Sequence, residues 1–317
     1  MNLSEISSLS EDQARELFER IRWPQGPMCP HCGSTDWIRL EGKTVRSGLY
    51  KCHGDDCGRQ FTATVNTVLE DTHLPIRTWL MAFSILTSAK KGISALQLQR
   101  QLGIKSYRSA WHLCHRIRHA MGKEPLRGML LGAGGRDVAV DESYIGARRP
   151  RKFTGPHTRG RGTKKTPVVA LIERGGRARA KVVADVTAPT LKQAIRENVD
   201  KSARIMTDEL RSYHGIGKEF EGGHVTVDHS AGEYSRDGLG TNEAEAFFAL
   251  LKRGITGSFH HVSKEHLQKY VDEFSFRWDL RKASDGERTE AAIKATEGKR
   301  LMLKEPVKNR KPSFWDM

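Results

Sequence analysis

The sequence predicts an α/β domain that is preceded by a small cysteine-containing module and a helical module. Three observations support this division. Four of the five cysteines stand in two close pairs before residue 60, residues 76–122 contain no proline, and strand-like and helix-like apolar segments alternate from Arg136 onward. A chain of 317 residues is long enough for two or three such domains.

The chain is strongly basic, with a formal net charge of +15 at pH 7 and an isoelectric point near 9.7. This excess favours a polyanionic partner such as nucleic acid, because each neutralised phosphate releases counterions. An ordinary basic enzyme is the alternative interpretation. No apolar run approaches the roughly 20 residues of a membrane span, and the N-terminus lacks the basic-then-apolar order of a secretory signal. We therefore expect no membrane partner and a cytoplasmic, nucleoid-associated protein.

The cysteine pairs predict a metal site in residues 23–72. Two residues separate Cys29 from Cys32, and four separate Cys52 from Cys57. Each pair is a knuckle whose two thiolates can grip one tetrahedral Zn²⁺, and residues 37–40 and 48–51 between the pairs suit a hairpin. This arrangement predicts a zinc ribbon with one structural Zn²⁺; buried or disulfide-linked cysteines are the alternative. The fifth cysteine, Cys114, fits a small buried hydrophobe in a helix.

Helices are expected on both sides of the ribbon. Residues 1–22 predict an N-terminal helix, and residues 73–122 predict a helix-turn-helix domain. Ser94 and Ser106 suit helix starts there, and Gly103 suits a stop between them. The last helix carries Arg108 and Arg116, which we expect to contact DNA. An ordinary three-helix bundle that contacts protein is the alternative.

Residues 123–135, which end in Gly-Ala-Gly-Gly, predict a linker to a catalytic domain at 136–285. Strands are expected at 136–146, 167–173, 180–186, 203–208 and 224–228, and helices at 190–199 and 241–253. Residues 286–317 predict a basic, extended tail.

Two of these strands end in an acid, and a later helix carries a third. Asp141 and Asp208 follow apolar strands, and Glu245 lies two helical turns before Lys252 on the same face. Carboxylates that converge from such elements suit a pair of Mg²⁺ or Mn²⁺ ions, which can clamp the attacking and leaving oxygens of a phosphoryl transfer. Taken singly, each acid fits a turn, a helix cap or a solvated side chain.

The chain resembles the bacterial insertion-sequence DDE transposases that carry an N-terminal zinc ribbon. The resemblance covers the ribbon and nearly all of residues 136–281, with motifs in the same order. The motifs are Asp141-Glu142-Ser143-Tyr144-Ile145-Gly146, Thr207-Asp208 with Tyr213-His214, and a long third motif that includes Thr241-Asn242, Glu245, Leu251-Lys252-Arg253, Phe259-His260-His261-Val262-Ser263, Tyr270, Glu273-Phe274 and Phe276-Arg277.

The resemblance implies an RNase H-like fold, which is a mixed sheet with flanking helices, and a catalytic triad of Asp141, Asp208 and Glu245. It implies that Lys252 is the basic residue that follows the third acid. It also implies hydrolysis and strand transfer on double-stranded DNA, at the element ends and the target, by a homodimer or higher oligomer. Two features depart from the pattern: the four-residue spacing in the second knuckle, and Asp279, where we expect Asn.

A run of eight basic residues without an acid lies between the first two predicted strands. Beside the metals, it would hold the DNA backbone; a solvated loop is the alternative. The expected DNA contacts there are Arg148, Arg149, Arg151, Lys152, Arg159, Arg161, Lys164 and Lys165, joined by Lys252 and Arg253 from the helix. We expect His229, His260 and His261 near the site, where the sequence assigns them no role; satisfied structural histidines are the alternative.

Two other functions compete with transposition. A zinc-ribbon DNA-binding regulator would explain the front half and the charge, but not the three acids. An RNase H-like nuclease would share the triad and cleave without strand transfer. An inactive, domesticated transposase is a third alternative.

Overall fold

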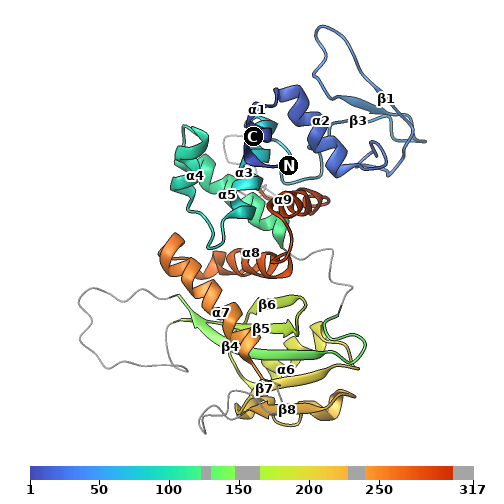
Figure 1. The fold of residues 1–317 in the computed structure, drawn as a ribbon. Helices are drawn as coiled ribbons and strands as arrows, with labels where there is room; N and C mark the ends of the chain where they lie inside the picture. Colours follow the sequence, from blue (N-terminus) through green and yellow to red (C-terminus); the bar gives the residue numbers. More distant parts are fainter. Residues whose placement is uncertain (123–129, 147–164, 228–239, 303–317) are drawn as a thin grey trace, which may run out of the picture.

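The computed structural model describes residues 1–122, 130–146, 165–227 and 240–302. Figure 1 shows the cysteine module and a helical body at one end and a sheet at the other, with helix α8 (Leu267–Asp279) lying between them. No helix within these ranges is long and apolar enough to cross a membrane.

The N-terminal segment forms two helices, α1 (Leu3–Ser8) and α2 (Glu11–Arg22), instead of the single predicted one. Ser10 ends the continuity because it caps α2: its side chain accepts a hydrogen bond from the backbone of Gln13, whose side chain bonds back to the Ser10 backbone. The capping box is visible in the sequence as Ser10 followed three residues later by Gln13.

The predicted hairpin is confirmed and gains a third strand. Strand β1 (Trp37–Arg39) pairs antiparallel with β2 (Tyr50–Cys52), which pairs antiparallel with β3 (Gln60–Phe61). The aromatic rings of this small sheet pack against one another: Tyr50 stacks on Phe61, with ring centroids 5.4 Å apart, and Trp37 meets Tyr50 edge-on at 5.0 Å.

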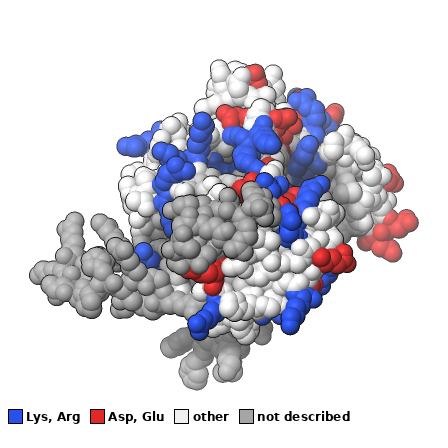
Figure 2. All heavy atoms as spheres, turned by 60° about the horizontal axis from the view of Figure 1, so that its bottom comes forward, with Lys and Arg blue, Asp and Glu red and all other residues white. Residues whose placement is uncertain are grey.

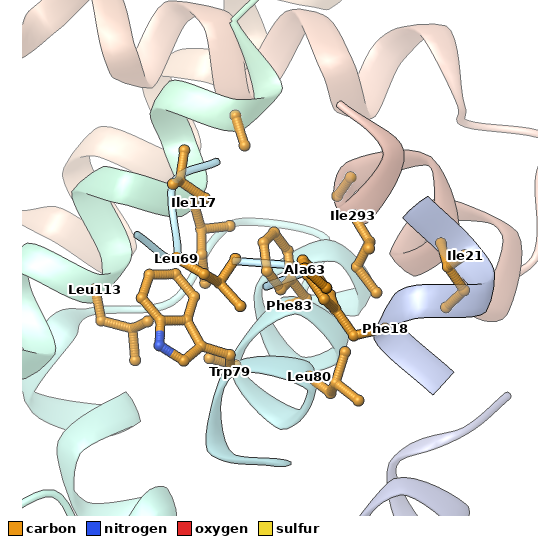
Figure 3. Packing of buried hydrophobic residues seen from close by; sticks show 14 of the residues in the cluster. Phe18, Ile21, Ala63, Leu69, Trp79, Leu80, Phe83, Leu113, Ile117 and Ile293 are labelled. Carbon is orange, nitrogen blue, oxygen red and sulfur yellow. The ribbon is translucent and has the colours of Figure 1, made fainter. Parts of the chain in front are cut away.

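The helical body consists of α3 (Ile76–Ser88), α4 (Ala95–Leu102), α5 (Tyr107–Met121) and α9 (Asp285–Lys294). As predicted, Ser94 caps α4, and Gly103 ends it in the left-handed conformation with φ of 64°. These helices and α2 share one core with the ribbon; Figure 3 shows Phe18, Phe83, Ile117 and Ile293 converging in it.

Helix α9 differs from the expectation of an extended tail at 286–317. Ala292 and Ile293 of α9 are fully buried in the core that the N-terminal helices form. At least 170 residues of chain separate them from the other helices of this core. Beyond the helix, Arg22 forms a salt bridge of 2.6 Å with Glu297, and Lys299 donates a 2.7 Å hydrogen bond to the Ala120 carbonyl. The described part of the predicted tail is therefore built into the helical body.

The catalytic domain predicted for 136–285 contains a mixed five-stranded sheet in the order β6-β5-β4-β7-β8. Strands β4, β5 and β6 pair antiparallel, whereas β4–β7 and β7–β8 are parallel. This confirms the RNase H-like, mixed-sheet prediction. The bounds are Asp137–Ile145 for β4, Thr166–Glu173 for β5, Ala178–Val182 for β6, Arg204–Asp208 for β7 and His224–Val227 for β8.

Helices cover both faces of this sheet (Figure 1). Val138 and Val140 point to the face covered by α6 (Ala188–Asn198), whereas Ala139 points to the face covered by α7 (Asn242–Gly254) and α8. The predicted linker contributes here as well: Leu131 is fully buried with α6 and forms a β-bridge to Val199.

Candidate zinc site and candidate active site

The four paired cysteines come together in the ribbon. Their Sγ atoms all lie within 4.8 Å of one another, with 3.8 Å between Cys29 and Cys57 and 3.5 Å between Cys32 and Cys52. Sulfurs arranged tetrahedrally around Zn²⁺ at about 2.3 Å are about 3.8 Å apart, so the cluster fits the ion. All cysteines are free thiols, which argues against the disulfide alternative. The ribbon therefore contains a four-cysteine zinc-binding site, and the longer second knuckle is compatible with it.

Asp141 and Asp208 lie side by side on the central strands. The parallel register of β4 and β7 pairs Ala139 with Met206, and each aspartate follows two residues later on its strand. Side chains two apart on a strand share a face, and adjacent strands are about 4.8 Å apart. Both aspartates therefore project towards the face that α7 covers, where Ala139 and Met206 are buried.

Glu245 reaches the same face from the first turns of α7. Ala244, Phe247, Phe248 and Leu251 anchor the helix on the sheet, while Glu245 is exposed beside this apolar stripe. Glu243 ties the start of the helix down, because its carboxylate accepts hydrogen bonds of 3.0 and 3.3 Å from the Gly175 backbone. The helix thus holds the third acid over the ends of the strands.

The electrostatics of Asp141 reflect this convergence. Burial, followed by the charges of Glu142, Asp208 and Glu245, raises the pKa of Asp141 to about 7, although its Oδ1 accepts a 2.7 Å bond from the Glu142 backbone. Carboxylates that repel one another in this way form a site that favours a bound cation. The spacing is wider than in the ribbon: among the described residues, the cysteines alone form a group of ligand atoms within 4.8 Å.

Polar neighbours hold the two strand ends in place. Tyr213 donates a 2.7 Å hydrogen bond to Glu142, and burial, followed by the charge of Glu142, raises the pKa of this tyrosine. Asp208 Oδ1 accepts a 3.1 Å bond from the Leu210 backbone, and the Thr207 hydroxyl lies 2.8 Å from His224 Nε2. Both Glu142 and Tyr213 stood in the quoted motifs, and sequence reasoning gave neither a role.

The basic residues expected to contact DNA fall into three groups. Arg108, Lys165, Lys252 and Arg253 are exposed. Arg148, Arg149, Arg151, Lys152, Arg159, Arg161 and Lys164 lie outside the described residues, as does His229. Figure 2 brings the sheet end of the molecule forward and shows lysines and arginines over much of that face, with smaller groups of acids between them.

Arg116 alone makes up the third group. Its residue is only 7% exposed, so its side chain is not available to DNA. Its guanidinium lies over the Trp79 ring and donates to the Glu70 carbonyl. His115 and Arg118 on the same helix are also buried. The expectation that α5 lies along a DNA groove is therefore corrected: apart from its first turn, which includes Arg108, this helix belongs to the core.

Asp279, which departs from the family pattern, has a structural partner. Its Oδ1 accepts a 2.7 Å hydrogen bond from the Ala178 backbone at the start of the edge strand β6. Gln268 does the same further along, accepting from Val182 at 2.8 Å and donating to the Ala180 carbonyl. Helix α8 thereby satisfies the free edge of the sheet.

Solved structures similar to this chain include the Mos1 transposase paired-end complex with left transposon end, at 16% identity and a TM-score of 0.27, over 68% of this chain and 74% of that one. A pre-cleavage Mos1 transpososome matches at 15% identity and a TM-score of 0.26, over 93% of this chain and 99% of that one.

Sequence families give the stronger match. An uncharacterized protein in transposable element ISH50 of Halobacterium salinarum is 29% identical over 283 residues, which are 86% of this chain and 92% of the relative. Residues 9–60 match the transposase zinc-ribbon domain, and residues 129–279 match the ISXO2-like transposase domain. These two matches contain the zinc-binding site and all three converging carboxylates. The chain belongs to the insertion-sequence transposases that carry an N-terminal zinc ribbon and an ISXO2-like transposase domain.

Proposed function

We propose that this transposase binds the ends of its element and catalyses both hydrolysis of a phosphodiester and transfer of the freed strand to target DNA. The observation that carries the proposal is the register of β4 and β7, which sets Asp141 beside Asp208 under the helix that bears Glu245. The raised pKa of Asp141 supports it, since strongly perturbed carboxylates gather at functional sites.

In this proposal, Asp141, Asp208 and Glu245 hold two Mg²⁺ or Mn²⁺ ions. Once bound, the ions would supply an activated nucleophile and neutralise the charge that builds on the leaving oxygen. The protein's own contribution is position: the two strands fix the aspartates, and Glu243 and the apolar stripe of α7 fix Glu245. Tyr213 orients Glu142 next to the first aspartate.

DNA would be held by the exposed cations of the sheet domain and by Arg108 on the helical body. Lys252 lies two turns after Glu245 on α7, so it is suited to contact a phosphate of the reacting strand. Joining two element ends requires two active sites, and we propose that a homodimer or a higher oligomer assembles on DNA at the nucleoid.

An assay of cleavage and strand transfer tests this function. The substrates are duplexes taken from the flanks of the gene and a supercoiled target plasmid, with Mg²⁺ or Mn²⁺. We expect the wild type to yield joined products, and Asp208→Asn and Glu245→Gln to bind DNA but lose activity by at least about a thousandfold. Glu221→Gln, which changes an exposed acid of the same domain outside the three carboxylates, is the matched control and should keep activity within a few fold.

Two results would redirect the assignment. A wild type that binds the ends but neither cuts nor joins them with either ion would support the zinc-ribbon regulator. Cleavage without a joined product would support a nuclease that lacks strand transfer.

A further inference from the structure

A basic cleft opens beside the carboxylates, where β4 and α7 end. Its volume is about 800 Å³, which is large enough for a nucleotide unit of a DNA backbone. The ionisable residues among its described lining are Lys165, Lys252, His260 and His261 with Tyr144, and none of the lining residues that the structure describes is acidic. Both lysines and both histidines are exposed, so their side chains are available to a ligand.

The backbone at His260 is held in an unfavourable conformation. Its φ of 60° and ψ of −40° lie outside the regions that non-glycine residues favour. Three other described non-glycine residues have positive φ, and all are Asp or Asn, which tolerate it more easily than other side chains. Such strained backbone is found at ligand sites and active sites when the surroundings enforce it.

The surroundings enforce this turn through Phe259. Helix α7 continues into a single π-helical turn, Ile255–Phe259, which ends just before His260. The Phe259 ring packs edge-on against Tyr270, with centroids 4.7 Å apart, and lies under the guanidinium of Arg118 at 5.0 Å. It also sits so close to Gly92 that a Cβ there would lie 2.4 Å from the ring. With Phe259 anchored in this way, the chain turns at His260 and presents both histidines to the cleft.

The hydrogen bonds of the two histidines leave ring nitrogens for a ligand. His260 Nδ1 lies 3.2 Å from the Thr256 carbonyl, and because a carbonyl only accepts, Nδ1 carries the proton. Its Nε2 is then the ring nitrogen that remains for other partners. The His261 backbone donates to the Phe259 carbonyl at 2.6 Å, and the exposed His261 ring has no described hydrogen-bond partner.

The cleft lies a fixed distance from the carboxylates along two elements. Tyr144 follows Asp141 by three residues on β4, and Lys252 follows Glu245 by seven on α7. Both steps correspond to about 10 Å, at about 3.3 Å per strand residue and 1.5 Å per helix residue. Two or three nucleotides of duplex cover this length at about 3.4 Å each. A strand that reacts at the carboxylates therefore passes the cleft with a neighbouring phosphate.

We propose that this cleft binds a backbone phosphate two or three nucleotides from the scissile one, with His260 and His261 as phosphate-contacting residues beside Lys165 and Lys252. The inference rests on the proposed function, since it takes the carboxylates to mark the reacting phosphodiester. It assigns a role to the strained turn: the cleft fixes the register of the DNA strand over the three acids.

Binding to element-end duplexes in Ca²⁺, measured by fluorescence anisotropy, tests this inference in the full chain. Single phosphates near the cleavage point are replaced one at a time by an uncharged methylphosphonate. We expect one position within about three nucleotides of the cleaved bond to weaken wild-type binding. In His260→Gly and His261→Ala, binding to the natural duplex should weaken, the salt dependence should fall by about one phosphate, and the same methylphosphonate should have no further effect.

The choice of glycine separates a binding role from a structural one. Glycine relieves the positive φ, so His260→Gly should unfold at the same temperature as the wild type or higher while it binds DNA more weakly. Lys218→Ala, which removes one exposed charge that does not line the cleft, should leave the methylphosphonate pattern unchanged.

Two results would overturn the inference: wild-type affinity in both histidine variants, or equal sensitivity to every methylphosphonate in wild type and variants. These outcomes are independent of catalysis. If the wild type cleaves DNA and no position couples to the histidines, the cleft assignment fails alone. If a position couples but no condition gives cleavage, the cleft binds phosphate and the proposed chemistry fails.

Discussion

Arg118 on α5 and Glu273 on α8 form an ion pair that is closed to solvent. The Arg118 Nε lies 2.6 Å from the Glu273 carboxylate, and the two side chains are 2% and 0% exposed. Arg277, one turn further along α8, binds the second carboxylate oxygen at 2.5 Å and donates to carbonyls at the end of α3, including that of Leu86. One buried carboxylate thus links the helical body to the helix that covers the edge of the catalytic sheet.

Glu273→Gln should destabilise the protein by about 3–5 kcal/mol, because it leaves two buried guanidinium groups without their counter-charge. Arg118→Met should cost less, since Glu273 keeps Arg277 as its partner. Urea denaturation measures both. The exposed pair of Arg196 and Glu219 is the control, where Arg196→Met should cost much less than Glu273→Gln. Equal costs for Glu273→Gln and Arg196→Met would show that the buried pair has no special role.

Zinc content should depend on the four paired cysteines alone. Cys32→Ser should reduce bound zinc from one ion per chain to nearly none, because a structural site needs all four ligands. Cys114→Ser is the control, since this buried cysteine lies outside the ribbon and should leave the metal in place. Elemental analysis of the purified proteins gives the stoichiometry. Full zinc content in Cys32→Ser would point to a different ligand set.

The elements that position the site were predictable from local patterns. A run of apolar residues followed by an acid predicts the strands that end in Asp141 and Asp208. The cysteine spacing predicts the ribbon directly. The local patterns do not give the distances between the two strands, or between these strands and the helix that carries the third acid. The register that sets the two aspartates side by side is a long-range pairing, and no local signal encodes it.

The predictions that were wrong for the helical body failed for one physical reason. Helix α5 is rich in arginine and histidine, which suggested an exposed, DNA-contacting surface, yet Arg116 and Arg118 are buried. Their partners lie 46 and 155 residues away, at the Glu70 carbonyl and at Glu273. A buried charge is tolerated only when it is paired, and distant partners cannot be recognised from the helix alone. The burial of α9 against the same body was hidden for the same reason.

Metal binding at the proposed catalytic carboxylates should weaken as the pH falls through about 7. The folded protein raises the pKa of Asp141 from 3.8 to about 7, so the stability this group contributes is present below pH 3.8 and is lost as the pH rises through 7. A bound cation offsets that loss and competes with the proton. We expect Mg²⁺ or Mn²⁺ to raise the melting temperature clearly at pH 8 and very little at pH 5.

Asp141→Asn is the matched comparison for the metal effect. Without metal it should gain stability relative to the wild type as the pH rises from 4 to 8, because it removes the carboxylate that burial and its acidic neighbours disfavour. It should also lose the stabilisation by metal at pH 8. A metal effect of the same size at pH 5 and pH 8 would place the cation elsewhere in the protein.

His115 on α5 should make the protein sensitive to acid. Burial lowers the pKa of this histidine to about 2, helped by the charge of Arg118, and neither ring nitrogen has a hydrogen-bond partner in the described structure. Because the unfolded chain takes up a proton near pH 6.5 and the folded chain does not, stability falls as the pH drops below 6.5.

His115→Leu removes this difference and leaves no unsatisfied polar group. We expect it to gain about 1 kcal/mol on the wild type for each pH unit below 6.5, measured by urea denaturation between pH 5 and 8. Parallel pH curves for wild type and His115→Leu would mean that the buried ring takes up its proton without opening the helical body.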